Sequence, residues 1–229
     1  MLKTAILVDG GFYRRRAQAL WGEKHSQDRA NELMNYCKNH LNFNNQNAEL
    51  YRIFYYDCPP MGKKIYHPLL KRQIDFEKSD LFKWTTEFFN ELKKKRKVAL
   101  RLGALAESQA HFNLDPDITK KLCRGAINWS DVTEDNFKLD VKQKGVDMKI
   151  GVDIASLAYK RQINQIVLIS ADSDFVPASK LARREGLDFV LDPMYASIKP
   201  ELHEHIDGLR SFRSPYCPPK TKIYTPKIK

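Results

Sequence analysis

Two patterns of apolar and polar positions follow one another along most of the chain, namely continuous apolar runs and apolar residues at helical spacing. Continuous apolar runs rich in β-forming residues predict strands at residues 5–8, 50–55, 98–102, 166–169 and 189–191. Helical spacing of apolar positions predicts helices over residues 28–40, 80–95 and 177–185, and another that begins near Phe12. Helices that alternate with apolar strands are typical of an α/β three-layer sandwich around a mostly parallel sheet.

The clearest helix pattern leads into the strand at residues 166–169. Its predicted buried face consists of Val146, Ile150, Ile154, Leu157 and Ala158. On a helical wheel, Asp147 and Asp153 lie on opposite shoulders of this face, roughly 120° apart. Asp147 opens the helix, so a capping role is the alternative to a functional one.

The middle and the end of the chain are less regular. We expect a helix near residues 68–74, an edge strand or bulged extension at 137–143, a short helix within 199–206 and a strand at 209–212. The inner face of the 80–95 helix should include Leu81, Trp84, Phe88 and Leu92. We interpret residues 1–212 as one domain whose part 57–137 is least regular, followed by a basic, proline-containing tail at 213–229.

Composition narrows the class of protein. The chain has 229 residues, of which 42% are hydrophobic, and this is enough for a sizeable core. No apolar run approaches the length of a membrane span, and no signal peptide is visible. Four scattered cysteines favour free thiols in a reducing compartment, so we expect a cytoplasmic protein without a membrane partner. The oligomeric state stays open, a homo-oligomer included.

The net charge of +11 favours a polyanionic partner, and nucleic acid is the commonest one. A generically basic protein is the alternative. Besides the tail, the candidate nucleic-acid-binding residues are Arg14, Arg15, Arg16, Lys93, Lys94, Lys95, Arg96 and Lys97. Cations also suit a helix C-terminus, which accounts for part of the second group.

Carboxylates follow two of the predicted strands. Asp9 ends the first, and Asp172 and Asp174 follow the strand at 166–169. Because parallel strands end at one edge of a sheet, these side chains can converge there, with Asp147 contributed by the helix. Clustered carboxylates repel one another unless a cation balances them, and Mg²⁺ or Mn²⁺ prefers oxygen ligands. A helix N-cap pair is the alternative for Asp172 and Asp174.

Three motifs follow one another along the chain: Asp9-Gly10-Gly11, Lys144-Gly145-Val146-Asp147 with Asp153 six residues on, and Ser170-x-Asp172-Ser173-Asp174-Phe175. Together they resemble the NYN-domain family of PIN-like, metal-dependent ribonucleases. The resemblance implies that Asp9, Asp147, Asp172 and Asp174 bind metal and catalyse, with Asp153, Ser170, Gly10 and Lys144 in support. It also favours RNA as the substrate. In the family the first turn often reads Asp-x-x-Asn, whereas Phe12 occupies the Asn position here.

Other site classes fit less well. A haloacid-dehalogenase-type phosphatase needs an acid at the position of Gly11, and a dinucleotide fold needs a longer glycine pattern. Ser170 and Ser173 lack a glycine elbow, and His203-x-His205 with Asp207 fits a solvated patch better than a metal site. We therefore predict a metal-dependent nuclease, most simply an RNA endonuclease. The alternatives are a non-catalytic nucleic-acid-binding or regulatory protein on the same fold, and a scaffold that uses its basic tail for protein contacts.

Overall fold

The computed structural model describes residues 2–43 and 48–215, which form two compact units. The first unit comprises Met1–Asp57, Glu87–Gly103 and Gly145–Lys229, and the second comprises Cys58–Thr86 and Ala104–Lys144. All four carboxylates predicted to bind metal belong to the first unit, whereas Lys144 belongs to the second.

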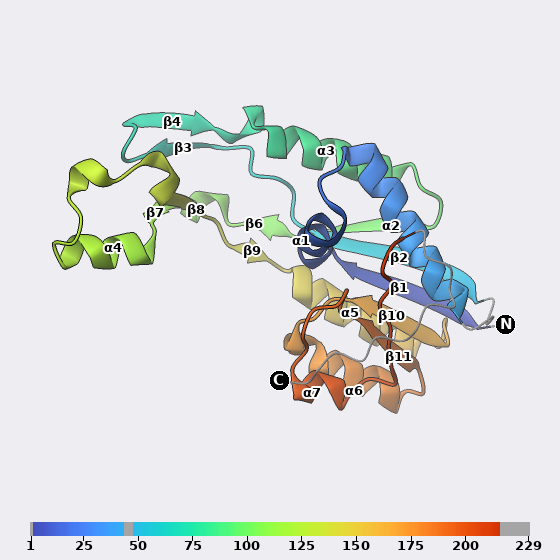
Figure 1. Ribbon diagram of the computed structural model, residues 1–229. Helices are drawn as coiled ribbons and strands as arrows, with labels where there is room; N and C mark the ends of the chain where they lie inside the picture. Colours follow the sequence, from blue (N-terminus) through green and yellow to red (C-terminus); the bar gives the residue numbers. More distant parts are fainter. Residues whose placement is uncertain (1, 44–47, 216–229) are drawn as a thin grey trace. The chain divides into compact units, whose positions relative to one another are not determined.

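The first unit is built on a six-stranded, all-parallel sheet with the order β12-β11-β10-β1-β2-β5 (Figure 1). The strands are β1 (Lys3–Asp9), β2 (Glu49–Asp57), β5 (Val98–Leu102), β10 (Gln165–Ile169), β11 (Asp188–Asp192) and β12 (Gly208–Leu209). The five predicted strands from residue 5 to residue 191 are confirmed. Residues Ala5 to Val8 of β1 are fully buried, because both faces of a central parallel strand are covered.

Helices cover both faces of this sheet, which confirms the α/β prediction. Adjacent residues of a strand point to opposite faces. Tyr55 of β2 packs against Phe88 at the end of α3 (Asp80–Lys93), on the face where α1 (Gly10–Trp21) and α2 (Ser26–Leu41) lie. Tyr56 instead donates a hydrogen bond to Asp153 of α5 (Val146–Tyr159). α6 (Val176–Arg184) packs against α5, and α7 (Pro200–His203) follows later in the chain.

The buried side of α5 is the one predicted from its periodicity. All five apolar positions, Val146, Ile150, Ile154, Leu157 and Ala158, are buried. The prediction for α3 is only partly right. Phe88 and Leu92 are buried as expected, but Leu81 is 67% exposed, and the helix ends at Lys93 rather than at residue 95.

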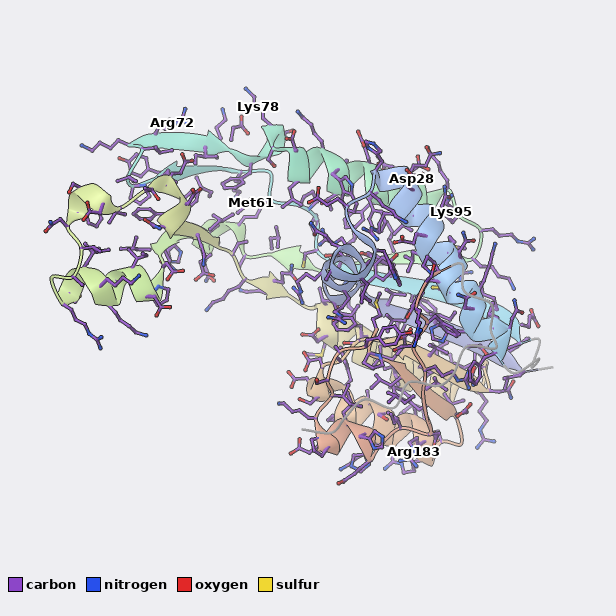
Figure 2. The ribbon with its side chains drawn as sticks, in the orientation of Figure 1. Asp28, Met61, Arg72, Lys78, Lys95 and Arg183 are labelled. Carbon is purple, nitrogen blue, oxygen red and sulfur yellow. The ribbon has the colours of Figure 1, made fainter. Side chains whose placement is uncertain are left out.

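The second unit contains three two-stranded antiparallel pairs. They are β3 (Lys64–His67) with β4 (Arg72–Asp75), β6 (Ala104–Leu105) with β9 (Gln143–Lys144), and β7 (His111–Leu114) with β8 (Phe137–Asp140); α4 (Pro116–Cys123) lies between β7 and β8 in the chain. The helix expected near residues 68–74 is wrong, because β3 and β4 form a hairpin there, with Arg72 beginning β4 (Figure 2). Lys71 takes a left-handed φ of 51° in its turn, which a helix does not permit. The extension expected at 137–143 is confirmed as β8 and β9.

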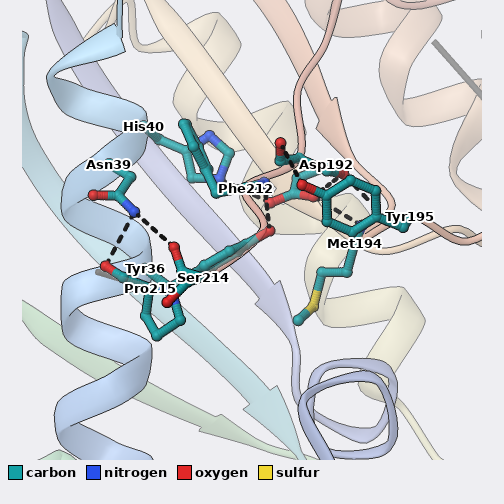
Figure 3. A network of polar contacts seen from close by, with 10 residues as sticks. Tyr36, Asn39, His40, Asp192, Met194, Tyr195, Phe212, Ser214 and Pro215 are labelled. Carbon is teal, nitrogen blue, oxygen red and sulfur yellow. Dashed lines mark hydrogen bonds and ion pairs between the residues drawn. The ribbon is translucent and has the colours of Figure 1, made fainter. Parts of the chain in front are cut away.

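The last described segment of the chain docks onto α2 (Figure 3). The amide of Asn39 donates to the carbonyls of Ser214 and Pro215, at 3.4 and 3.1 Å. Phe212 is 1% exposed and packs edge-on against Tyr36 and His40. The strand expected at 209–212 is therefore wrong in extent: β12 stops at Leu209, and Phe212 is held by α2. The tail beyond Pro215 lies outside the described residues.

Two sequence expectations concern the whole chain. Cys37, Cys58 and Cys123 are free thiols, as expected, and Cys217 lies outside the described residues. Within the described ranges, no helix has both the length and the apolar character that a membrane span requires.

Candidate metal-binding edge of the sheet

Asp9 is the anchored carboxylate of the candidate site. It ends β1 and is the N-cap of α1, because its Oδ1 accepts the N–H of Phe12 at 3.0 Å. Its Oδ2 accepts the hydroxyl of Ser170, which follows β10, at 3.3 Å. The carboxylate is thus held from two neighbouring strands. The carboxyl ends of β1 and β10 meet here, as the sequence predicted.

The sequence predicted a helix from about Phe12, after the Gly10-Gly11 pair. The helix instead begins at Gly10, without an intervening turn. A Cβ at position 10 would lie 2.6 Å from the ring of Tyr55 and 2.6 Å from the carbonyl oxygen of Tyr56. Gly10 therefore allows α1 to start directly against β2, and this close approach sets the direction of Asp9.

Asp172 and Asp174 border the same sheet edge. They lie around a short 3-10 turn, Ser173–Phe175, where Asp172 accepts the N–H of Asp174 at 3.0 Å. The N–H of Asp172 in turn donates to the Ser170 hydroxyl at 3.3 Å. Capping therefore accounts for one oxygen of Asp172, the Oδ1 that accepts the N–H of Asp174. Both carboxylates are exposed, so a desolvation cost applies to Asp9 rather than to them.

Asp147 lies in the first turn of α5 but does not cap it. The N-cap is Gly145, with a left-handed φ of 80°, and no side chain makes a capping hydrogen bond there. Partial desolvation by the surrounding protein raises the pKa of Asp147, and the neighbouring Asp172 and Asp174 carboxylates raise it further. The capping alternative for Asp147 is thus not observed, and its charge is coupled to those of Asp172 and Asp174.

The pKa of Asp9 is also raised from its ordinary value. Burial is the largest cause, and the charge of Asp147 adds to it, while the bonds from Phe12 and Ser170 and the charge of Arg15 oppose it. Asp9 and Asp147 therefore influence each other, and Asp147 is coupled to the other pair. The four predicted carboxylates form one electrostatic group at this edge.

A hollow of about 400 Å³ opens beside these carboxylates, between α5 and α6. Asp147 and Asp174 lie on it, and Met148, Phe175 and Leu181 give it an apolar wall. This wall was not predicted from the sequence. Its signal is the pair of apolar residues next to the two acids, Met148 after Asp147 and Phe175 after Asp174.

Asp153 lies one and a half turns further along α5, with different partners. Its Oδ2 accepts the hydroxyl of Tyr56 at 2.8 Å and the Nε–H of Arg101 at 3.1 Å. These contacts tie α5 to β2 and β5. The structure thus connects Asp153 with the strands under the helix.

Asp57 is a carboxylate that the sequence argument missed. It ends β2, next to β1 in the sheet, and is 1% exposed. Arg14 lies 3.0 Å from its carboxylate, and the Tyr55 hydroxyl donates to it at 3.3 Å. Applying the strand-end rule to this third strand would have identified it. Its arginine partner indicates a buried ion pair that orients α1.

The predicted nucleic-acid-binding residues divide into two groups. Arg14 and Arg16 contribute to the fold, because Arg14 pairs with Asp57 and Arg16 donates to the carbonyl of Met194. Lys93 and Lys94 are exposed, and their side chains contact the nearby Asn90 and Glu91 of α3. Arg15 and Arg96 are exposed. Arg15 is close enough to Asp9 to lower the pKa of that carboxyl. Lys95, Arg96 and Lys97 line a separate hollow, at the other edge of the sheet.

In the part of the chain that the structure describes, no three His, Cys, Asp or Glu side chains are close enough to hold one metal ion. The donor set is nevertheless composed only of carboxylate oxygens, which suit Mg²⁺ and Mn²⁺. Asp147, Asp172 and Asp174 are exposed, so their side chains have room to rotate toward Asp9.

An all-parallel α/β sheet whose edge carries coupled carboxylates is consistent with a PIN-like fold. A protein-family model, the NYN domain, matches residues 63–204, more than half of the chain. The chain belongs to the NYN domain family, which is a PIN-like nuclease family. This indicates a nuclease-type hydrolase whose substrate is nucleic acid, in a family that typically uses divalent metals. The match includes Asp147, Asp172 and Asp174 and begins after Asp9.

No curated protein matches the chain significantly. Among solved structures, the crystal structure of a protein of unknown function from Vibrio parahaemolyticus is similar, with a TM-score of 0.46 and 13% sequence identity. The alignment covers 92% of this chain and 93% of that chain.

Proposed function

We propose that this protein is a divalent-metal-dependent ribonuclease that hydrolyses phosphodiester bonds at the edge formed by Asp9, Asp147, Asp172 and Asp174. The observation that carries the proposal is the electrostatic coupling of these carboxylates where the parallel strands end. A packing role does not require such repulsion. A bound cation would relieve it, and the family typically uses one.

The role proposed for each residue follows from how firmly its side chain is held. Asp9, fixed by Phe12 and Ser170, is the natural anchor for a Mg²⁺ or Mn²⁺ ion, with Asp172 as a second ligand. Such an ion lowers the pKa of a water and stabilises the charge on a phosphoryl oxygen. Asp147 or Asp174 would accept a proton from the attacking water and orient it. Ser170 supports Asp9 and Asp172 together, since its hydroxyl contacts both residues.

Lys144 and Asp153 have supporting roles in this proposal. Lys144 precedes the glycine that opens α5, and it would meet a phosphate of the substrate. Asp153, held by Tyr56 and Arg101, would keep α5 and therefore Asp147 in position against the sheet. RNA is the favoured substrate because of the family resemblance and the net charge of +11.

The test is cleavage of single-stranded and structured RNA with Mn²⁺ or Mg²⁺ and with a chelator. We expect cleavage to require the metal and to be abolished by Asp9→Asn and by Asp172→Asn. Both variants keep the size of the side chain, and their RNA affinity without metal should match the parent's. Asp28→Asn, on the exposed start of α2, is the matched control and should cleave normally.

A thermal melt gives an independent reading of the same site. Metal that binds only the folded protein should stabilise it by about 2.7 kcal/mol at a hundred times its dissociation constant. Asp172→Asn should lose most of this stabilisation. If the two site variants cut RNA as well as the parent does, the activity lies elsewhere, and a non-catalytic nucleic-acid-binding protein becomes the better interpretation.

A further inference from the structure

A second hollow, of about 760 Å³, lies between α2 and the connection from α3 to β5. Its volume is in the range of small-molecule sites. Four cationic side chains line it, one from α2 and three from the connection: Lys38, Lys95, Arg96 and Lys97. The sequence placed three of them in a linear basic run. The structure adds Lys38 and shows that the four surround one space.

This hollow is separate from the carboxylate edge. Leu50, which lines it, stands near the start of β2, whereas Asp57 ends that strand. Seven residue steps at about 3.3 Å each place the two ends roughly 23 Å apart. Because all strands of the sheet are parallel, the carboxylates gather at the other edge. The four cations therefore do not neutralise the candidate metal site.

Only part of this positive charge has a structural role. The ammonium of Lys95 donates to Asn31 of α2 at 2.5 Å (Figure 2 labels Lys95). Lys97 donates to the carbonyl of Leu50 and lies 3.6 Å from the Glu49 carboxylate. Lys38 and Arg96 are exposed, and neither makes an ion pair with any described residue. The helix dipole favours cations at the C-terminal end of α3, and it also favours Lys38, which lies in the last turn of α2.

The remaining lining residues indicate what kind of anion fits. Asn31 and Asn35 present side-chain amides next to the cations, and Met34 and Leu50 supply apolar surface. Phosphate oxygens accept hydrogen bonds from lysine, arginine and amide groups. A base or ribose attached to the phosphate could cover the apolar part. A phosphate alone would leave that surface unused.

We propose that this hollow binds the phosphate of a nucleotide unit, carried either by an RNA strand or by a free nucleotide. The site does not depend on the nuclease reaction, because its residues lie at the other edge of the sheet. A strand that is held here and cleaved at the carboxylates would have to span both sites. A free nucleotide would occupy the hollow without reaching the carboxylates.

The experiment measures binding without divalent metal, so that cleavage plays no part. The probes are a single-stranded RNA of about 12 nucleotides, adenosine monophosphate and inorganic phosphate. The test variant is Lys38→Gln with Arg96→Gln. Both side chains are exposed and unpaired, so the fold should survive. The control is Lys160→Gln with Arg161→Gln, which also removes one exposed lysine and one exposed arginine from the first unit.

We expect the test variant to bind the RNA roughly tenfold more weakly at low salt, with a salt slope lower by about 1.4, or 0.7 for each lost phosphate contact. The control should bind like the parent. Glu49→Gln removes the carboxylate beside Lys97 and should strengthen binding, an effect that a merely structural role would not produce.

Competition distinguishes the two sources of the phosphate. Displacement of the RNA by adenosine monophosphate, but not by equal inorganic phosphate, supports a nucleotide-sized ligand. If neither adenosine monophosphate nor inorganic phosphate displaces the RNA, the hollow binds the phosphates of an RNA strand. Equal affinities and salt slopes for the parent, test and control proteins, together with no gain in Glu49→Gln, would overturn the proposal. A failure of RNA cleavage in the separate metal assay would not affect it.

Discussion

Replacing Gly10 by alanine tests how closely α1 approaches the sheet. The new Cβ would lie 2.6 Å from the Tyr55 ring, 2.6 Å from the Tyr56 carbonyl oxygen and 2.7 Å from Asp57 Oδ2. None of these neighbours can yield easily. Tyr55 and Asp57 are buried, and the Tyr56 oxygen belongs to the backbone of β2. Overpacking of this kind costs about 3 kcal/mol, which exceeds the gain of up to about 1 kcal/mol from better helix propensity.

Gly11→Ala is the matched control, one residue further along α1. Its Cβ would lie 3.6 Å from Asp9 Oδ1 and 3.9 Å from the Arg15 guanidinium, and both are ordinary contacts. The gain in helix propensity then has no steric cost against it, so we expect the substitution to stabilise the protein by about 0.5 kcal/mol.

Urea or thermal unfolding measures both changes. For a protein of this size, about 3 kcal/mol corresponds to a Tm lowered by roughly 6–12 °C for Gly10→Ala. Gly11→Ala should leave Tm unchanged or raise it slightly. The reasoning is refuted if the two variants are equally destabilised, or if Gly10→Ala costs nothing. The helix that this substitution displaces carries the Phe12 N–H that holds Asp9. Gly10→Ala should therefore also reduce the stabilisation by metal.

Two further predictions concern the first unit. Phe212→Ala removes a ring that is 1% exposed and should cost about 3–5 kcal/mol in urea unfolding, because the cavity against Tyr36 and His40 cannot close; a loss below about 1 kcal/mol would mean that the last segment is not docked there. Asp9→Asn should make the metal-free protein more stable at neutral pH. The raised pKa of Asp9 means that its protonated form favours folding below the unfolded value, and this is lost as pH rises through the folded pKa. The advantage of the variant should shrink as pH falls through the raised folded pKa of Asp9 toward the unfolded value, and a difference independent of pH would contradict this assignment.

The sheet was predictable because its physical signal is strong. Strands buried on both faces must be continuously apolar, and residues 166–169 cannot be mistaken for a surface segment. α5 was equally clear, since a helix that packs on a sheet shows one apolar stripe. The hairpin of β3 and β4 was missed because its strands are only four residues long and His67 is their one buried residue. Such short strands give no clear apolar alternation in the sequence.

The candidate site was predictable in composition but not in detail. The strand-end rule brought Asp9 and Asp172 to one edge, and the structure places both there. The sequence could not show that Ser170 contacts both residues, since that depends on the register between β1 and β10. It also could not show what Gly10 approaches, because the close neighbours come from β2, about 45 residues away in the chain.

Phe12 in place of asparagine bears on the site less than its position suggests. The contact that orients Asp9 comes from the main-chain N–H of residue 12, and any residue but proline supplies it. The substitution therefore keeps the anchor and removes only a side-chain donor and acceptor. Of the four carboxylates, Asp9 is fixed by two hydrogen bonds, whereas Asp147, Asp172 and Asp174 are exposed. One fixed and three exposed carboxylates explain why the group is coupled without converging on one point. In the proposed metal site, a cation would draw the exposed acids toward Asp9, so we expect metal stabilisation to depend first on the Asp9 anchor.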